Sequence, residues 1–319
     1  MRARLCSGLL CLLLASGCSV LPSRATPAHA AGVALQQVPF FPQSDYQCGP
    51  AALAMLLSSA GIAVTPEALV PQVYLPARHG SLQAELLAAA RRHDRLPYVI
   101  DPTAAALQAQ LKAGHPVLVL QNFGSRRSPL WHYAVVIGYE PGARAYLLRS
   151  GITARQRLVA RRFLATWERA DHWAVVLAAP GQVPIGAQPA RYLQAMSALE
   201  SAGHYPAAAL GYAAAVAQWP DAPLAWFGLA GVRLAQGQPA AAETAYEQLL
   251  QRAPAHVAAR NNLAVLLARR GCIDAARSQL SRARSDDRGT HAATLADTAV
   301  ELDRLAATAR GLPENCPAP

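Results

Sequence analysis

The 319-residue chain has little charge, few aromatic residues and almost no lysine. Charged residues make up 15% of the chain and aromatic residues 6%, and Lys112 is the single lysine among 29 basic residues. The arginines are scattered with no run of five basic residues, so the net charge of +10 does not indicate a nucleic-acid partner. A Gly-rich phosphate loop and histidines at metal-ligand spacing are both absent from the sequence. We therefore expect no cofactor and no metal.

What the chain does contain is enough apolar sequence for folded cores. Hydrophobic residues make up 53%, which excludes a disordered chain, and the length suggests two domains. Six cysteines are too few for a disulfide-dense miniprotein. The cysteines instead become informative once the compartment is considered.

The N-terminus has the pattern of a secretory signal. Arg2 and Arg4 precede an apolar run at residues 9–15, which is too short to span a bilayer. The run ends in small residues before Cys18, an arrangement that resembles the lipobox of bacterial lipoproteins. The resemblance implies cleavage after residue 17 and lipid attachment to the Cys18 thiol.

Ser19 follows that cysteine in place of aspartate, which by analogy with lipoprotein sorting favours the outer membrane, with the protein facing the periplasm. The alternative is an ordinary signal peptide cut after the small-residue site at 28–30. Residues 18–35 are predicted to form a tether. No later run reaches the length of a membrane helix.

Three cysteines remain after the signal is removed and Cys18 is lipidated. An oxidising compartment favours pairing, and Cys272 and Cys316 both lie in the C-terminal region. We predict a disulfide between them, with two free thiols as the alternative. Cys48 is then the unpaired cysteine, which in a secreted protein marks a reactive thiol.

Residues 36–179 mix helical and strand patterns. Helices are expected first and short apolar strands later, which favours an α+β domain over a parallel α/β sheet. Ser81 is the expected cap of the second helix, with Glu85 in its first turn. The predicted helices are 48–60, 81–93 and 103–113, and the predicted strands are 97–100, 116–121, 132–139, 146–148 and 173–177. Residues 180–189 form a predicted Pro/Gly-rich linker.

A period of 34 residues follows the linker. The period is carried by glycines, alanines and prolines in phase: Gly203, Gly237 and Gly271; Ala207, Ala241 and Ala275; Pro220 and Pro254. A helix-turn-helix unit of this length resembles the tetratricopeptide repeat. Three repeats are predicted over residues 190–288, with a capping helix and tail at 289–319.

Cys48 and His132 have the sequence context of a catalytic pair. Cys48 begins a predicted helix, where the helix dipole is expected to lower the pKa of the thiol. His132 begins a predicted strand. Cysteine first on a helix and histidine later on a strand is the chain order of papain-like cysteine peptidases. Gln43 upstream can supply an oxyanion donor, with Gln47 as the alternative.

Residues 43–53 and 132–139 together resemble the bacteriocin-processing peptidases that cleave double-glycine leaders. The layout is most similar to free-standing relatives with a lipoprotein signal and C-terminal tetratricopeptide repeats. The resemblance implies an α+β papain-like cysteine peptidase domain followed by an all-α helical-repeat domain. It also implies that Cys48 is the nucleophile, His132 the general base and Gln43 the oxyanion-hole residue.

The sequence departs from the family at Ser150, which stands where the family usually has aspartate. A serine can accept a hydrogen bond from the imidazole but supplies no negative charge. Glu140 and Asp171 also follow His132 and are possible substitutes. Asp101 precedes the histidine and is assigned to a turn.

These features favour a membrane-anchored, periplasm-facing thiol hydrolase that cleaves a peptide or amide bond. Its expected partners are a peptide or protein substrate, a protein bound by the repeats, and the membrane through Cys18. The alternative is a weak or inactive peptidase-like scaffold, which Ser150 favours. The same site chemistry also permits transfer of the acyl group to an amine instead of to water.

Overall fold

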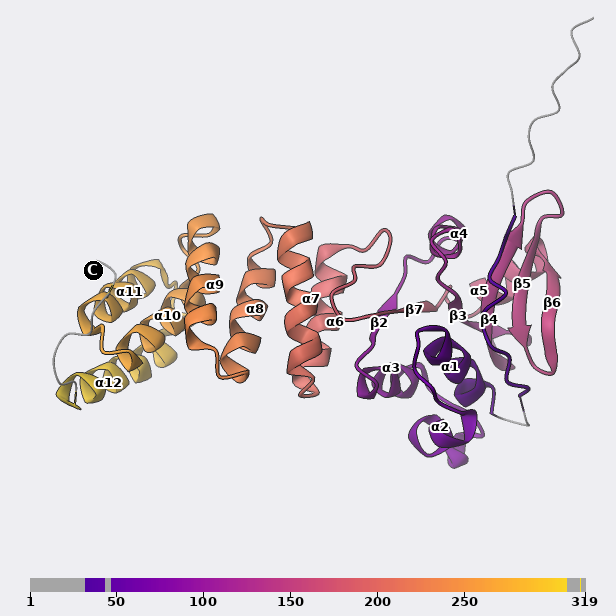
Figure 1. Cartoon of the computed structure of the whole chain (residues 1–319), viewed down its shortest axis with the longest axis horizontal. Helices are drawn as coiled ribbons and strands as arrows, with labels where there is room; N and C mark the ends of the chain where they lie inside the picture. Colours follow the sequence, from indigo (N-terminus) through magenta and orange to yellow (C-terminus); the bar gives the residue numbers. More distant parts are fainter. Residues whose placement is uncertain (1–31, 44–46, 309–315, 317–319) are drawn as a thin grey trace, which may run out of the picture.

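The computed structural model describes residues 32–43, 47–308 and 316 (Figure 1). A domain of sheet and helices is followed by a row of helices that leads away from it to the far end of the molecule (Figure 1). The expected order, an α+β domain and then an all-α repeat domain, is confirmed. The signal sequence and Cys18 lie outside the described residues. Among the helices that are described, none is both long and apolar enough to cross a bilayer.

One sheet of seven strands organises the first domain, and every strand pairs antiparallel with its neighbours. Six strands run in the order β2-β7-β3-β4-β5-β6, and β1 pairs with the end of β4 that β3 leaves uncovered. The strands are β1 (Val33–Ala34), β2 (Leu96–Val99), β3 (Val117–Asn122), β4 (Trp131–Glu140), β5 (Ala145–Ser150), β6 (Thr153–Val159) and β7 (Ala174–Ala178).

Helix α1 lies at the centre of this domain. Its sequence is apolar on nearly all sides, and residues 49–57 are all buried, because the helix packs against β4 and the neighbouring strands. The helices of the domain are α1 (Cys48–Ser59), α2 (Pro66–Val73), the short 3₁₀ helix η1 (Pro76–Arg78), α3 (Gln83–Arg92), α4 (Ala104–Lys112) and α5 (Ala160–Glu168). Of these, α2 and α3 pack on α1, whereas α4 packs on β3 and β4 and α5 packs on β3, β5 and β6.

Several elements differ from the sequence-based expectation. The predicted tether reaches residue 35, whereas Val33–Ala34 forms β1. The strand β6 and the helices α2 and α5 were not predicted. The reason is clearest for β6, an edge strand that is mostly exposed and carries arginines in place of an apolar run.

The predicted cap of the second helix is wrong. Helix α3 begins at Gln83, and its N-cap is Leu82, whose side chain makes no capping hydrogen bond. Ser81 lies in the preceding segment, where its carbonyl oxygen accepts a hydrogen bond from the hydroxyl of Tyr133 at 3.2 Å. Tertiary contacts therefore override the local capping pattern at this position.

The helices of the second domain follow the 34-residue period. First helices of the pairs begin at residues 189, 223 and 257, and second helices at 205, 239 and 273. The three glycines of the period have φ of 83°, 71° and 89°, a backbone conformation that favours glycine. The helices are α6 (Pro189–Ser201), α7 (Tyr205–Gln218), α8 (Pro223–Ala235), α9 (Pro239–Arg252), α10 (Val257–Arg269), α11 (Ile273–Asp286) and the additional α12 (Ala292–Thr308).

The predicted linker is fixed to the first domain. The backbone N–H of Gln188 donates to the hydroxyl of Tyr98 at 3.0 Å, and the side chain of Gln110 donates to the carbonyl of Ile185 at 2.7 Å. Helix α6, which already begins at Pro189, packs on β2. Its buried Tyr192 belongs to the same hydrophobic cluster as the core under the sheet. The repeats therefore continue the core of the first domain.

Cys272 and Cys316, the pair expected from the sequence, are joined by a disulfide in the structure. Their Cα atoms are 5.4 Å apart. Cys272 lies in the turn between α10 and α11, and Cys316 follows α12 in the chain. The bond therefore fastens the tail after α12 to the last repeat.

We predict that removing this bond destabilises the C-terminal repeats. The closed loop spans 44 residues, and its chain entropy corresponds to about 3–4 kcal/mol of unfolding free energy. Urea unfolding of the Cys272→Ser/Cys316→Ser variant measures the loss, and the alkylation rate of Cys48 controls for an intact first domain. Intact mass with and without reductant checks the bond itself: an unchanged mass instead of a gain of about 2 Da contradicts it.

Candidate active site

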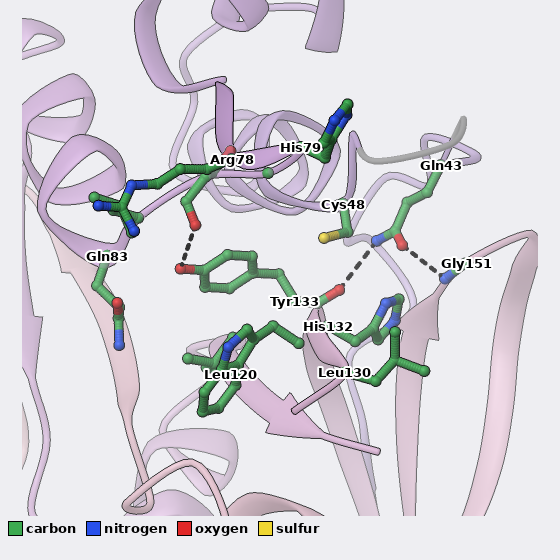
Figure 2. Close-up of a pocket in the computed structure, with 14 residues that line it drawn as sticks. Gln43, Cys48, Arg78, His79, Gln83, Leu120, Leu130, His132, Tyr133 and Gly151 are labelled. Carbon is green, nitrogen blue, oxygen red and sulfur yellow. Dashed lines mark hydrogen bonds between the residues drawn. The ribbon is translucent and has the colours of Figure 1, made fainter. Parts of the chain in front are cut away.

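A cleft of about 620 Å³ opens at the N-terminal end of α1 (Figure 2). It brings Gln43, Cys48 and His132 together from the segment before α1, from α1 and from β4. Residues 78–80, which follow α2 in the chain, also line it. The full lining is Gln43, Cys48, Arg78, His79, Gly80, Ser81, Leu82, Gln83, Leu120, Leu130, Trp131, His132, Tyr133 and Gly151.

Cys48 is a free thiol at the first position of α1. Burial raises the pKa of this thiol, and this effect outweighs the backbone N–H groups of Tyr133, Gly49 and Cys48 itself, which favour the thiolate. The pKa therefore lies above its ordinary value. The expectation that the helix terminus lowers it is wrong in its net direction, because the same packing that places the helix end at the sheet removes water from the sulfur.

His132 is the second residue of β4 and is held on two sides. Its Nε2 lies 2.9 Å from the Oγ of Ser150, and its ring stacks on Phe123 with 5.2 Å between centroids. Burial lowers the pKa of the imidazole, so the ring is neutral at neutral pH. Because Nε2 faces Ser150, Nδ1 is the ring nitrogen that remains for Cys48.

Ser150, at the end of β5, thus stands beside the distal nitrogen of His132, where the sequence predicted the third residue. The acids considered as substitutes lie elsewhere. Glu140 ends β4 at its other terminus and pairs with Arg157 at 2.8 Å. Asp171 lies in an exposed turn after α5. Within the described part of the chain, no carboxylate lines the cleft.

Gln43 has a side-chain amide whose orientation is fixed by the backbone. Its Oε1 accepts from the N–H of Gly151 at 3.0 Å, and its Nε2 donates to the carbonyl of Tyr133 at 3.2 Å (Figure 2). The amide has a second Nε2 hydrogen, which can serve an oxyanion in the cleft. Gln47, the alternative, is the N-cap residue of α1 and does not line the cleft.

Two residues that support the site were not identified from the sequence. The guanidinium of Arg149 donates to the carbonyls of Val38 at 2.8 Å and Gln36 at 3.4 Å, and thereby ties the segment leading to Gln43 onto β5. Tyr133 contacts Cys48 and Gln43 through its backbone. The only signals in the sequence are their positions directly beside Ser150 and His132.

The comparisons with known families divide the chain in the same way as the structure. Residues 35–175 match the family described as Peptidase_C39 like. Residues 192–237 and 233–297 match two families of tetratricopeptide repeats. No curated protein sequence matches the chain.

Similar solved structures include proteins related to each part. A C39-like protein from Bacillus anthracis is 18% identical with a TM-score of 0.39, over 46% of this chain and 98% of that chain. A double-glycine-motif protease from an AMS/PCAT transporter, solved with its leader peptide, is 20% identical with a TM-score of 0.35. The match covers 46% of this chain and 94% of that chain. The tetratricopeptide domain of P58(IPK) is 25% identical with a TM-score of 0.35, and the match covers 37% of this chain and 33% of that chain.

The family matches and the observed secondary structure divide the chain into the same two parts. The sheet domain with its cleft corresponds to the first match, and the paired helices after Pro189 correspond to the repeat matches. The chain thus carries a domain of the C39-like peptidase family followed by tetratricopeptide repeats.

Proposed function

We propose that this protein is a thiol hydrolase that cleaves a peptide or amide bond at Cys48. The observation that carries the proposal is the single cleft shared by a free thiol, an imidazole held by Ser150 and a backbone-fixed glutamine amide. These are the nucleophile, general base and oxyanion donor that acyl transfer requires.

The proposed reaction proceeds in two halves. Nδ1 of His132 takes the thiol proton as the sulfur attacks the substrate carbonyl, and Gln43 and the N–H of Cys48 hold the oxyanion. The C–N bond then breaks, and the imidazolium gives its proton to the leaving amine, which leaves a thioester. Water attacks the thioester, His132 takes its proton, and the C–S bond breaks to return the thiol. An amine in place of water would give acyl transfer.

The charge state of the resting site follows from burial and from Ser150. With the pKa of Cys48 raised and that of His132 lowered, thiol and imidazole are both neutral at neutral pH. The proton therefore moves during attack, and Ser150 provides a hydrogen bond without a charge to stabilise the imidazolium. Without that charge we expect hydrolysis to be slower than in an enzyme with a carboxylate at position 150. An inactive peptidase-like scaffold is the second candidate function.

The repeats are proposed to recruit a protein partner or the substrate. Tetratricopeptide families match residues 192–297, and repeats of this kind present extended binding surfaces. Because Tyr192 shares the core of the sheet domain, a bound partner would be held in a fixed orientation to the cleft.

Membrane anchoring through a lipid on Cys18, on the periplasmic side of the outer membrane, is proposed from the sequence alone. Val33 of β1 pairs with Tyr139, whereas His132 lies near the opposite end of β4. The point where the predicted tether joins the domain and the cleft therefore lie at opposite ends of β4. Lipid on the N-terminal peptide of the mature protein, lost in Cys18→Ala, tests the anchor.

We expect Cys48→Ala to abolish labelling by iodoacetamide at this position and all hydrolysis of a peptide library. His132→Ala should lower hydrolysis by about 10³-fold or more, because the general base is lost. His115→Ala, a part-buried histidine that contacts Gln110 outside the cleft, is the control and should behave as wild type. Hydrolysis that persists in Cys48→Ala contradicts the proposal.

The alkylation rate should also report the raised pKa of Cys48. Because the folded thiol has the higher pKa, the fraction of thiolate at a given pH is smaller in the native protein than in the urea-unfolded chain. The native rate should therefore keep rising with pH after the unfolded rate has levelled off. A native plateau below about pH 7 would instead indicate a preformed thiolate–imidazolium pair.

Ser150→Asp places a carboxylate beside Nε2 of His132, which should raise the pKa of the imidazole and stabilise its charged form. We expect hydrolysis and alkylation at neutral pH to be preserved or to rise by up to about tenfold. Ser150→Ala, which removes the acceptor, should lower both. If the aspartate and alanine variants are equally impaired, Ser150 is not the third residue.

A further inference from the structure

One short segment forms much of the cleft wall. Residues 78–83 all line the cleft; residues 78–82 belong to the segment between α2 and α3, and Gln83 is the first residue of α3. The loop closes on itself: the N–H of Leu75 donates to the carbonyl of Gly80 at 2.8 Å, and η1 lies between them. We call residues 75–82 the wall loop.

The wall loop rests directly on the residue after the nucleophile. A Cβ added to Gly49 would lie 2.3 Å from the Oγ of Ser81 and 2.6 Å from its Cβ. Glycine at position 49 thus allows the loop to contact the start of α1. This contact is steric and does not by itself connect the loop to the reacting groups.

Tyr133 supplies a link between the loop and the reacting groups. Its hydroxyl donates to the carbonyl of Ser81 at 3.2 Å, which Figure 2 draws as a dashed line from the tyrosine. Its backbone N–H favours the thiolate of Cys48, and its backbone carbonyl accepts from Gln43. The side chain is 3% exposed and packs edge-on against Trp173. One residue therefore contacts nucleophile, oxyanion donor and wall.

We propose that Tyr133 is a positioning residue whose hydroxyl fastens the wall loop, and so sets how a polypeptide is held beside Cys48 without changing the reactivity of the thiol. The two roles separate by atom. The thiol and Gln43 make their hydrogen bonds with the backbone of Tyr133, which any residue supplies, whereas the loop accepts one from the side-chain hydroxyl. Burial and the charge of a Cys48 thiolate both raise the pKa of that hydroxyl, so it stays protonated as a donor to the loop. The inference rests on the proposed function only in assigning the wall to substrate binding.

Tyr133→Phe isolates the hydroxyl, because the ring and both backbone contacts are kept. Two reagents with the same reactive group measure the effect: iodoacetamide, which is too small to use the wall, and iodoacetyl-trileucine amide, chosen for the leucine side chains in the cleft. We expect the peptide reagent to alkylate the variant about tenfold more slowly, the effect of one hydrogen bond. The iodoacetamide rate and its pH profile should match wild type.

Tyr139→Phe, on the same strand and outside the cleft lining, is the matched control and should leave both rates unchanged. Amide hydrogen exchange gives a readout without any reagent: the N–H of Leu75 and Arg78, both bonded within the loop, should exchange faster in Tyr133→Phe.

Three outcomes overturn the inference. Equal slowing of both reagents would show that Tyr133 acts on the thiol or on folding, and no slowing of either would show that the hydroxyl holds nothing of consequence. A wild-type protein that prefers iodoacetamide to the peptide reagent would show that the wall does not bind a polypeptide. Alkylation needs no turnover, so failure to hydrolyse any peptide counts against the proposed function and leaves this test intact.

Discussion

The burial of α1 against β4 is the interaction on which the site depends. The helix is apolar on nearly all sides, so the sheet and the surrounding helices enclose it, and its first residue meets the beginning of β4. Cys48 and His132 are separated by most of the domain in sequence, and this one packing contact brings them to a common cleft. The backbone of Tyr133 then joins both to Gln43.

The same burial decides the chemistry of the pair. Removal of water raises the pKa of the Cys48 thiol and lowers that of the His132 imidazole, and both shifts favour neutral forms. A carboxylate beside the imidazole would oppose this, but Ser150 occupies that position. In the proposed mechanism the proton would therefore move during attack, and the rate would depend on how well the cleft holds the substrate carbonyl against the sulfur.

Patterns that are local in the chain could be predicted from the sequence. The apolar run after Cys48 predicts a helix that is buried on nearly all sides. The 34-residue period predicts stacked helix pairs, because each pair alone leaves an apolar face uncovered. The roles expected of Gln43, His132 and Ser150 came instead from the resemblance of residues 43–53 and 132–139 to a known peptidase family. Edge elements such as β6 carry no apolar pattern, since solvent covers one side of them, and were missed.

Other properties of the site arise only where segments distant in the sequence meet in the fold. The direction of the thiol pKa depends on how much water the packed sheet excludes, and no local pattern encodes that balance. The roles of Arg149 and Tyr133 depend on carbonyl groups more than 50 residues away, at Val38 and Ser81. Carbonyls are present at every residue, so local patterns predict many of the elements, whereas the packing of those elements selects which of these groups meet.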